Sequence, residues 1–293
     1  QDPGDAFFGM GSAPRRGKIN LEADKIYSLK VEYKWEGRFP AVQIGMQAPD
    51  QFNLMDEAAA IAKDADAVIL IVGTNSDWET EGNDRDNLDL PSNQNELVET
   101  VCKLNSNTVV VLNTGSPCEM PWVDEANAIL QCWFPGQEFG NSLADILFGV
   151  VNPSGKLPTT FPKKLSDTPA FPTYPGKDMQ MDYEEGLFIG YRWYDREAIE
   201  PLFPFGHGLS YTTFEYSDLR AIPPKGESSV AAFEVAVKNS GNVSGKEIVQ
   251  GYVGSSSSQI ERPNKELKKF DKVFLAPGAV SYTHLRAHET TRH

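Results

Sequence analysis

This sequence contains few cysteines and histidines, and it has no long hydrophobic run. Its cysteines are Cys102, Cys118 and Cys132, which are odd in number, lie in apolar surroundings and lack metal-ligand spacing. We therefore expect buried free thiols rather than a disulfide framework. The longest apolar stretch, residues 67–73, is much shorter than the 18 or so residues of a membrane span. The sequence thus predicts no membrane-spanning segment.

Basic residues are scarce relative to acidic ones. Lys and Arg number 27 against 41 Asp and Glu, which gives a formal net charge of −14 and a pI near 4.8. Nucleic-acid binding requires clustered positive charge at the phosphates, so this balance argues against a nucleic-acid partner and suits a neutral substrate such as a sugar. With 40% hydrophobic and 23% charged residues, the composition is that of a globular protein. The length is enough for about two domains.

Helical and strand patterns alternate between residues 53 and 148. The expected helices cover 54–64, 97–104 and 138–148, and the expected strands cover 67–73, 108–112 and 128–134. Alternating strands and helices predict an α/β sandwich with a mostly parallel sheet. Ligands of such sheets bind beyond the carboxyl ends of the strands, which is where the loop of residues 74–90 begins.

Strand patterns flank the α/β region on both sides. Period-2 alternation in residues 27–33 and 41–45 predicts the last strands of a β-rich module that ends at residue 52. The same period returns after residue 213 and predicts the start of a small β-sandwich. The chain begins at Gln1 without a methionine or a signal sequence, so we take this start as internal and infer no compartment.

The last fourteen residues, 280–293, depart from the sandwich pattern. They hold three of the four histidines, His284, His288 and His293, and resemble a translated sequencing-adapter read-through. We therefore expect a non-native, unpacked tail, and we assign no metal site to its histidines.

The loop after the first buried strand is the most informative segment. Its acidic residues lie within thirteen positions and are Asp77, Glu79, Glu81, Asp84, Asp86 and Asp89. A solvated acidic loop or a weak calcium site is the simplest interpretation, although the spacing does not match an EF-hand. A 17-residue loop inside a compact domain is, however, usually functional.

Ordered motifs along the chain resemble family 3 glycoside hydrolases, the β-glucosidase family. They are WETEGNDR at 78–85 with LDLP at 88–91, NTGSP at 113–117, WFPGQE at 133–138, NPSGKLP at 152–158, YEEG at 183–186, GYRWY at 190–194 and PFGHGLSYTTF at 204–214. The resemblance implies an α/β sandwich domain at 53–208 and a truncated fibronectin type III-like domain at 209–279. Residues 1–52 would be the end of an inserted β-rich module.

The resemblance also implies a retaining β-glucosidase that hydrolyses terminal non-reducing β-D-glucosyl residues by double displacement, without a cofactor or metal. An Asp in an N-terminal TIM barrel would attack the anomeric carbon, and a Glu of the α/β domain would protonate the leaving oxygen. We expect no nucleophile in this chain, since the barrel is missing, so the chain alone should be inactive. By motif position the acid/base is Glu81, with Glu79 as the alternative. The residues expected to support the loop are Trp78, Asp84 and Arg85.

Other functions stay open from the sequence. A β-xylosidase or an N-acetylglucosaminidase of the same family would differ in the barrel, and a non-catalytic carbohydrate-binding or interaction module would need no acid/base. Gly82, directly after Glu81, favours the enzyme, because glycine gives the backbone the freedom to project a carboxylate into a neighbouring cleft. The expected partners are a β-glucoside or oligosaccharide and the missing barrel, with neither nucleic acid nor membrane.

Overall fold

The computed structural model describes residues 17–34, 42, 44–46, 53–82, 84–222, 231–254 and 258–287. The chain divides into two compact units, which we describe separately. The first runs to residue 86 and includes residues 90–115 and 122–131, and the second holds the remainder. No helix within the described ranges is long and apolar enough to cross a membrane.

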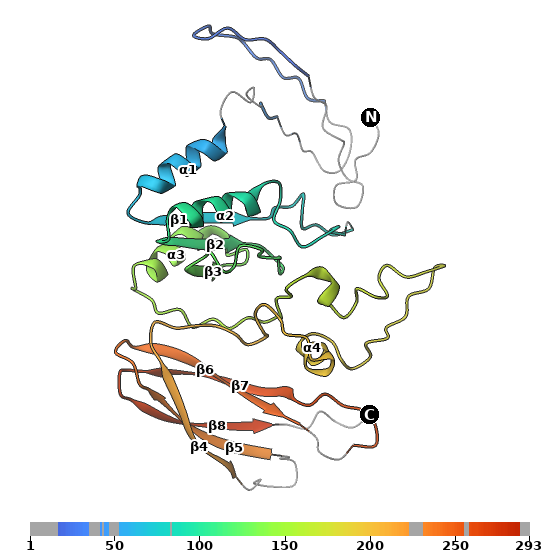
Figure 1. Cartoon of the computed structure of the whole chain (residues 1–293), viewed down its shortest axis with the longest axis vertical. Helices are drawn as coiled ribbons and strands as arrows, with labels where there is room; N and C mark the ends of the chain where they lie inside the picture. Colours follow the sequence, from blue (N-terminus) through green and yellow to red (C-terminus); the bar gives the residue numbers. More distant parts are fainter. Residues whose placement is uncertain are drawn as a thin grey trace. The chain divides into compact units, whose positions relative to one another are not determined.

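The first unit is built on a three-stranded parallel sheet (Figure 1). Its strands, in spatial order, are β1 (Val68–Gly73), β2 (Thr108–Asn113) and β3 (Ala128–Gln131). Helix α1 (Leu54–Asp64) precedes the sheet, and helix α2 (Gln94–Leu104) connects β1 to β2. The prediction of a parallel α/β arrangement is confirmed, and central β2 is the most deeply buried strand because it has a neighbour on each side.

The end of β1 is fixed to the start of α2. The Gln94 side chain accepts a hydrogen bond from the Gly73 amide at 2.7 Å and donates to the Gly73 carbonyl at 2.9 Å. It also donates to the Pro91 carbonyl at 3.2 Å. A Cβ on Gly73 would lie 2.1 Å from the Asn113 carbonyl oxygen, so only glycine permits this close approach. Both ends of the acidic loop are therefore anchored.

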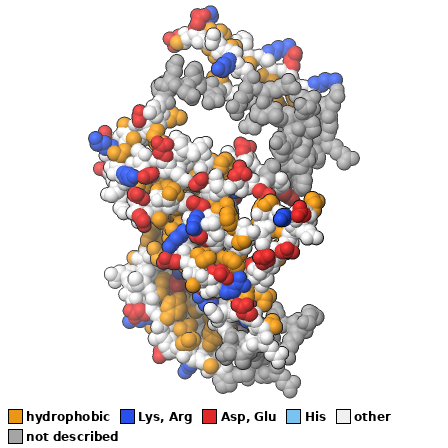
Figure 2. Space-filling view, turned by 45° about the vertical axis from the view of Figure 1, so that its right-hand side comes forward, with side chains coloured by type: hydrophobic (Ala, Val, Ile, Leu, Met, Phe, Trp, Pro, Cys, Tyr) orange, Lys and Arg blue, Asp and Glu red, His pale blue; other side chains and the backbone are white. Residues whose placement is uncertain are grey.

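The second unit contains an antiparallel β-sandwich (Figure 1). Its strands are β4 (Phe214–Ile222), β5 (Ala231–Asn239), β6 (Gly245–Val253), β7 (Glu266–Leu275) and β8 (Val280–Ala287). One sheet has the order β4-β5-β8, and the other pairs β6 with β7. The core is formed by Val235, Val237, Val249, Leu275 and Leu285. Hydrophobic side chains also gather on the outer surface of the sandwich in Figure 2.

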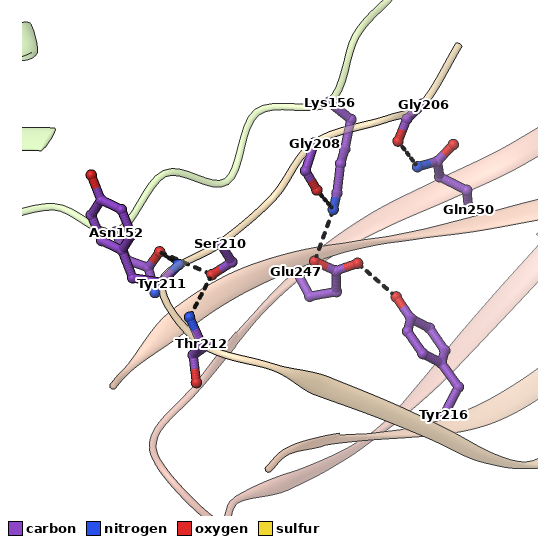
Figure 3. A network of polar contacts seen from close by, with 10 residues as sticks. All are labelled: Asn152, Lys156, Gly206, Gly208, Ser210, Tyr211, Thr212, Tyr216, Glu247 and Gln250. Atoms are coloured by element: carbon purple, nitrogen blue, oxygen red, sulfur yellow. Dashed lines mark hydrogen bonds and ion pairs between the residues drawn. The ribbon is translucent and has the colours of Figure 1, made fainter. Parts of the chain in front are cut away.

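The segment before the sandwich is mostly irregular and belongs to the same unit. It contains the 3₁₀ turns η1 (Gly136–Glu138) and η2 (Leu165–Asp167) and the helices α3 (Phe139–Leu147) and α4 (Tyr191–Glu197). Hydrogen bonds join this segment to the sandwich. Gln250 of β6 donates to the Gly206 carbonyl at 3.0 Å (Figure 3). Asn152 donates to the Ser244 carbonyl at 3.1 Å. The Tyr191 hydroxyl of α4 accepts from the Leu267 amide at 2.8 Å.

The strand predicted over residues 27–33 is absent from the structure. Residues 17–34 form no strand and are exposed throughout. An alternating segment becomes a strand only when a neighbour pairs with its backbone groups, and no described residue does so here. The other predicted strand, 41–45, lies partly outside the described residues. Membership of residues 1–52 in an inserted module stays a prediction.

The prediction of an unpacked tail was wrong for its first eight residues. They form β8, which pairs along its whole length with β5. Thr283 and Leu285 are 3% and 1% exposed, whereas Tyr282 and His284 face outward. His284 also pairs with the buried Glu234 of β5. Residues 288–293, with the other two histidines of the tail, lie outside the described residues.

Candidate active-site loop

The acidic loop leaves the carboxyl end of β1 beside the loop that follows β2. The Thr74 amide donates to the Asn113 carbonyl at 3.1 Å, which continues the pairing of the two strands by one residue. The Asn75 carbonyl then accepts from the amides of Trp78 and Glu79 at 3.0 and 2.8 Å. This turn reverses the chain and brings Glu79 back to the edge of the sheet.

Glu79 is held by hydrogen bonds from both loops. Its Oε1 accepts one from the Thr74 hydroxyl and another, at 3.0 Å, from the Gly115 amide. Glu79 is half-buried, so a carboxylate in this place needs such donors to offset its lost hydration. Two donors converging on one oxygen indicate an anchored side chain.

Glu81, two residues further on, is exposed. Its carboxylate makes no hydrogen bond or ion pair with any part of the chain that the structure describes. Gly82 follows with a φ of 86°, a left-handed conformation that glycine adopts without strain. The two candidate glutamates therefore differ: hydrogen bonds hold the Glu79 side chain, whereas the Glu81 side chain has no such partner among the described residues.

The residues predicted to support the loop differ in burial. Trp78 is half-buried, and its ring Nε1 is enclosed without a hydrogen-bond partner among the described residues. Arg85 is half-buried and Asp84 is exposed. That Trp78, Asp84 and Arg85 support the loop stays a prediction.

Sequence reasoning missed residues that directly follow β1 and β2 at this edge of the sheet. Thr114 is fully buried, and both its carbonyl and its hydroxyl accept hydrogen bonds from Gln131 Nε2 at 3.1 Å. Thr74 and Gly115 were missed as well. The signal was present in the NTGSP motif, whose Thr114 and Gly115 follow β2 at the same edge of the sheet. The NTGSP motif contributed to the family resemblance, but its residues were not predicted to contact the acidic loop.

The three cysteines lie outside the acidic loop of residues 74–90. Cys102 and Cys118 are buried, as predicted, whereas Cys132 is half-buried, and within the described residues none of the three forms a disulfide bond. Burial, with a smaller contribution from Glu125, raises the pKa of Cys102, and burial alone raises that of Cys132. Thiols shifted in this direction stay protonated at neutral pH and are poor nucleophiles. Within the described residues, no three His, Cys, Asp or Glu side chains are grouped to hold a metal ion.

The architecture is that of a parallel α/β unit with an acidic loop at its carboxyl edge, joined to an antiparallel sandwich. The Glycosyl hydrolase family 3 C-terminal domain matches residues 20–211, which is more than half of the chain, and the Fibronectin type III-like domain matches residues 247–290. The chain therefore belongs to glycoside hydrolase family 3, and its sandwich is a fibronectin type III-like domain.

Curated relatives support the same assignment. The chain is 52% identical to thermostable β-glucosidase B of Acetivibrio thermocellus over 77% of its own length and 30% of that protein. It is 43% identical to a β-glucosidase of Rhizobium radiobacter, over 94% of its own length and 35% of that protein. The chain thus spans about a third of the length of the curated relatives it matches.

Solved structures show the same fold. The β-glucosidase of Kluyveromyces marxianus in complex with glucose matches with a TM-score of 0.77 at 43% identity, over 83% of this chain and 29% of that one. The β-glucosidase DesR of Streptomyces venezuelae in complex with D-glucose has a TM-score of 0.76 at 40% identity. The match covers 80% of this chain and 30% of that one.

Proposed function

We propose that this chain supplies the general acid/base of a retaining β-glucosidase, and that Glu81 carries this role. The contrast between the two glutamates is the observation that supports it. Glu79 Oε1 already accepts hydrogen bonds from Thr74 and Gly115, whereas the Glu81 carboxylate is exposed and free of described partners. An acid/base must be able to reach a substrate oxygen and exchange a proton with it.

The chemistry requires Glu81 to act twice. In the first step, protonated Glu81 gives its proton to the glycosidic oxygen as the bond from that oxygen to the anomeric carbon breaks, while the nucleophilic carboxylate bonds to the carbon. In the second step, the Glu81 carboxylate takes a proton from water as the water oxygen attacks the same carbon and the nucleophile leaves. The proton count is restored after each cycle.

The nucleophile would come from the part of the relatives that lies upstream of this match. A retaining mechanism places the two carboxyl groups about 5–5.5 Å apart across the sugar, and this chain would provide one of them. The chain alone should then release only background aglycone from an aryl β-glucoside.

A glucoside is the substrate that the relatives favour. The curated relatives described above are named β-glucosidases, and the two solved relatives described above are in complex with glucose. A β-xylosidase or N-acetylglucosaminidase would differ in the sugar subsite, which we place upstream. A non-catalytic binding module would leave the exposed Glu81 beside Gly82 without a purpose.

Replacing Glu81 by Gln in the complete enzyme, with the upstream part joined to this chain, tests the proposal. The amide keeps the shape of the side chain but cannot donate the proton, so kcat/KM for a disaccharide should fall on the order of 10²–10⁴-fold. An activated aryl glucoside needs little protonation, and its first step should be spared. As a matched control, Asp86→Asn removes a charge from an exposed position of the same loop and should change neither rate. Equal losses on both substrates for Glu81→Gln would contradict the role of acid.

A further inference from the structure

Glu79 ties together the loops that follow two neighbouring strands. Thr74 directly follows β1, and Gly115 lies two residues beyond the end of β2. Both donate to the same oxygen of Glu79. The Glu79 carboxylate is thus bonded, at the carboxyl edge of the sheet, to the residues that follow both β1 and β2.

The backbone at Glu79 is fixed as well. Its amide donates to the Asn75 carbonyl at 2.8 Å, and the Trp78 amide donates to the same carbonyl at 3.0 Å. Glu79 is therefore held through both its main chain and its side chain. Glu81 is only two residues away, and two residues span at most about 7 Å of extended chain. The anchor at Glu79 consequently limits where the Glu81 backbone can lie.

We propose that Glu79 is a positioning residue that holds Glu81 in place for proton transfer. The inference rests on the acid/base role proposed for Glu81. A catalytic carboxyl group on a loop must be held close to its productive geometry, and a displacement of about 1 Å costs up to roughly 10²-fold in rate. Thr74 and Gly115 provide that support through the Glu79 carboxylate, because hydrogen bonds to an ionised acceptor are about twice as strong as neutral ones.

This role gives Glu79 a mutational signature that differs from that of an acid. Gln at position 79 retains an oxygen that can accept from Thr74 and Gly115, whereas Ala retains none. Glu79→Ala should therefore reduce kcat/KM for a disaccharide by about 10- to 100-fold. Glu79→Gln should restore most of that loss. Thr74→Val removes one donor without changing the shape of its side chain, and it should lower the same rate in the same direction.

The leaving group separates positioning from general damage to the loop. If Glu79 acts by positioning Glu81, Glu79→Ala should lower kcat/KM for a disaccharide far more than for an activated aryl glucoside. Glu81→Gln is expected to show the same pattern. A purely structural role would reduce both rates together and would lower the melting temperature in parallel. Melting curves of each variant identify any that fail to fold, and Thr74→Val then provides the milder perturbation.

A double-mutant cycle in the complete enzyme tests whether Glu79 acts through Glu81. With Glu81→Gln already present, Glu79→Ala should cause no further loss, since no acid remains to be positioned. If the two losses multiply while Glu81→Gln alone is strongly impaired, the positioning role is refuted and the acid/base assignment survives. If Glu81→Gln is harmless and Glu79→Gln is inactive, the proposed acid/base itself is wrong and Glu79 is the acid.

Discussion

Lys156 and Glu247 form an ion pair that is largely withdrawn from solvent. Their side chains are 15% and 11% exposed, and Lys156 Nζ lies 3.2 Å from Glu247 Oε2. Further partners complete the pair (Figure 3): Lys156 donates to the Gly208 carbonyl at 2.7 Å, and the Tyr216 hydroxyl donates to Glu247 Oε1 at 2.8 Å. Removing one member of such a pair leaves the other charge poorly hydrated and unpaired.

We therefore expect Glu247→Gln to lower the free energy of unfolding of this chain by about 3 kcal/mol. Adding Lys156→Met should recover much of that loss, because no buried charge would remain. Lys163→Met breaks the exposed pair with Glu200 and serves as the control with no measurable effect. Chemical denaturation measures all of these variants. An undetectable effect of Glu247→Gln would show that the pair contributes nothing to the stability of the fold.

Tyr216 provides a second readout of the same contact. Burial, followed by the hydrogen bond and charge of Glu247, raises the pKa of Tyr216 above the ordinary tyrosine range. Glu247→Gln removes the charge, so the Tyr216 phenol should ionise at lower pH in that variant than in the parent chain. An absorbance titration in alkaline solution, with Tyr216→Phe to identify the signal, checks the direction of the change.

At the scale of single residues, the sequence predicted which carboxylates were candidates but not how they differ. The motif around Gly82 identified Glu81 and Glu79 as the two choices. Their different situations depend on Thr74 and Gly115, which are 5 and 36 residues from Glu79 along the chain. A pairing across two loops has no local pattern, so only the structure could show it.

At the scale of elements, β8 is the clearest departure from expectation. Its buried residues include Thr283 and Leu285. Because Thr283 is polar, hydrophobic alternation did not reveal the strand. Elements with stronger periodicity were predicted closely, since α1 covers the predicted residues 54–64 and β1 begins one residue after the predicted start. Strand β3 ends at Gln131, three residues before the predicted end. Trp133, just beyond it, has a φ of 56°, which an extended backbone does not allow.

The packing of β8 can be tested with one substitution. Leu285→Ala removes a side chain that is 1% exposed in the sandwich core. We expect it to destabilise the sandwich by about 2–5 kcal/mol, the usual range for such a cavity. Tyr282→Ala on the outer side of the same strand, 58% exposed, should have a much smaller effect. Equal and negligible changes in thermal denaturation would show that β8 does not belong to the core.

At the scale of the whole molecule, composition excluded more than it identified. The net charge of −14 argued against nucleic acid, and on the face drawn in Figure 2 the basic side chains are interspersed with acidic ones. Composition alone did not point to a glycosidase; the ordered motifs did, and the family match over residues 20–211 confirms them. The nucleophile and the sugar specificity stay proposals, since the chain spans only about a third of its curated relatives.

The most direct test of the central claim is azide rescue of Glu81→Gln in the complete enzyme. With an activated aryl glucoside, this variant should form the glycosyl-enzyme and then stall, because the base that activates water is missing. Azide needs no base, so it should accelerate turnover and yield a β-glycosyl azide. Glu79→Gln should show no such acceleration. Rescue of Glu79→Gln instead, or an unimpaired Glu81→Gln enzyme, would contradict the account.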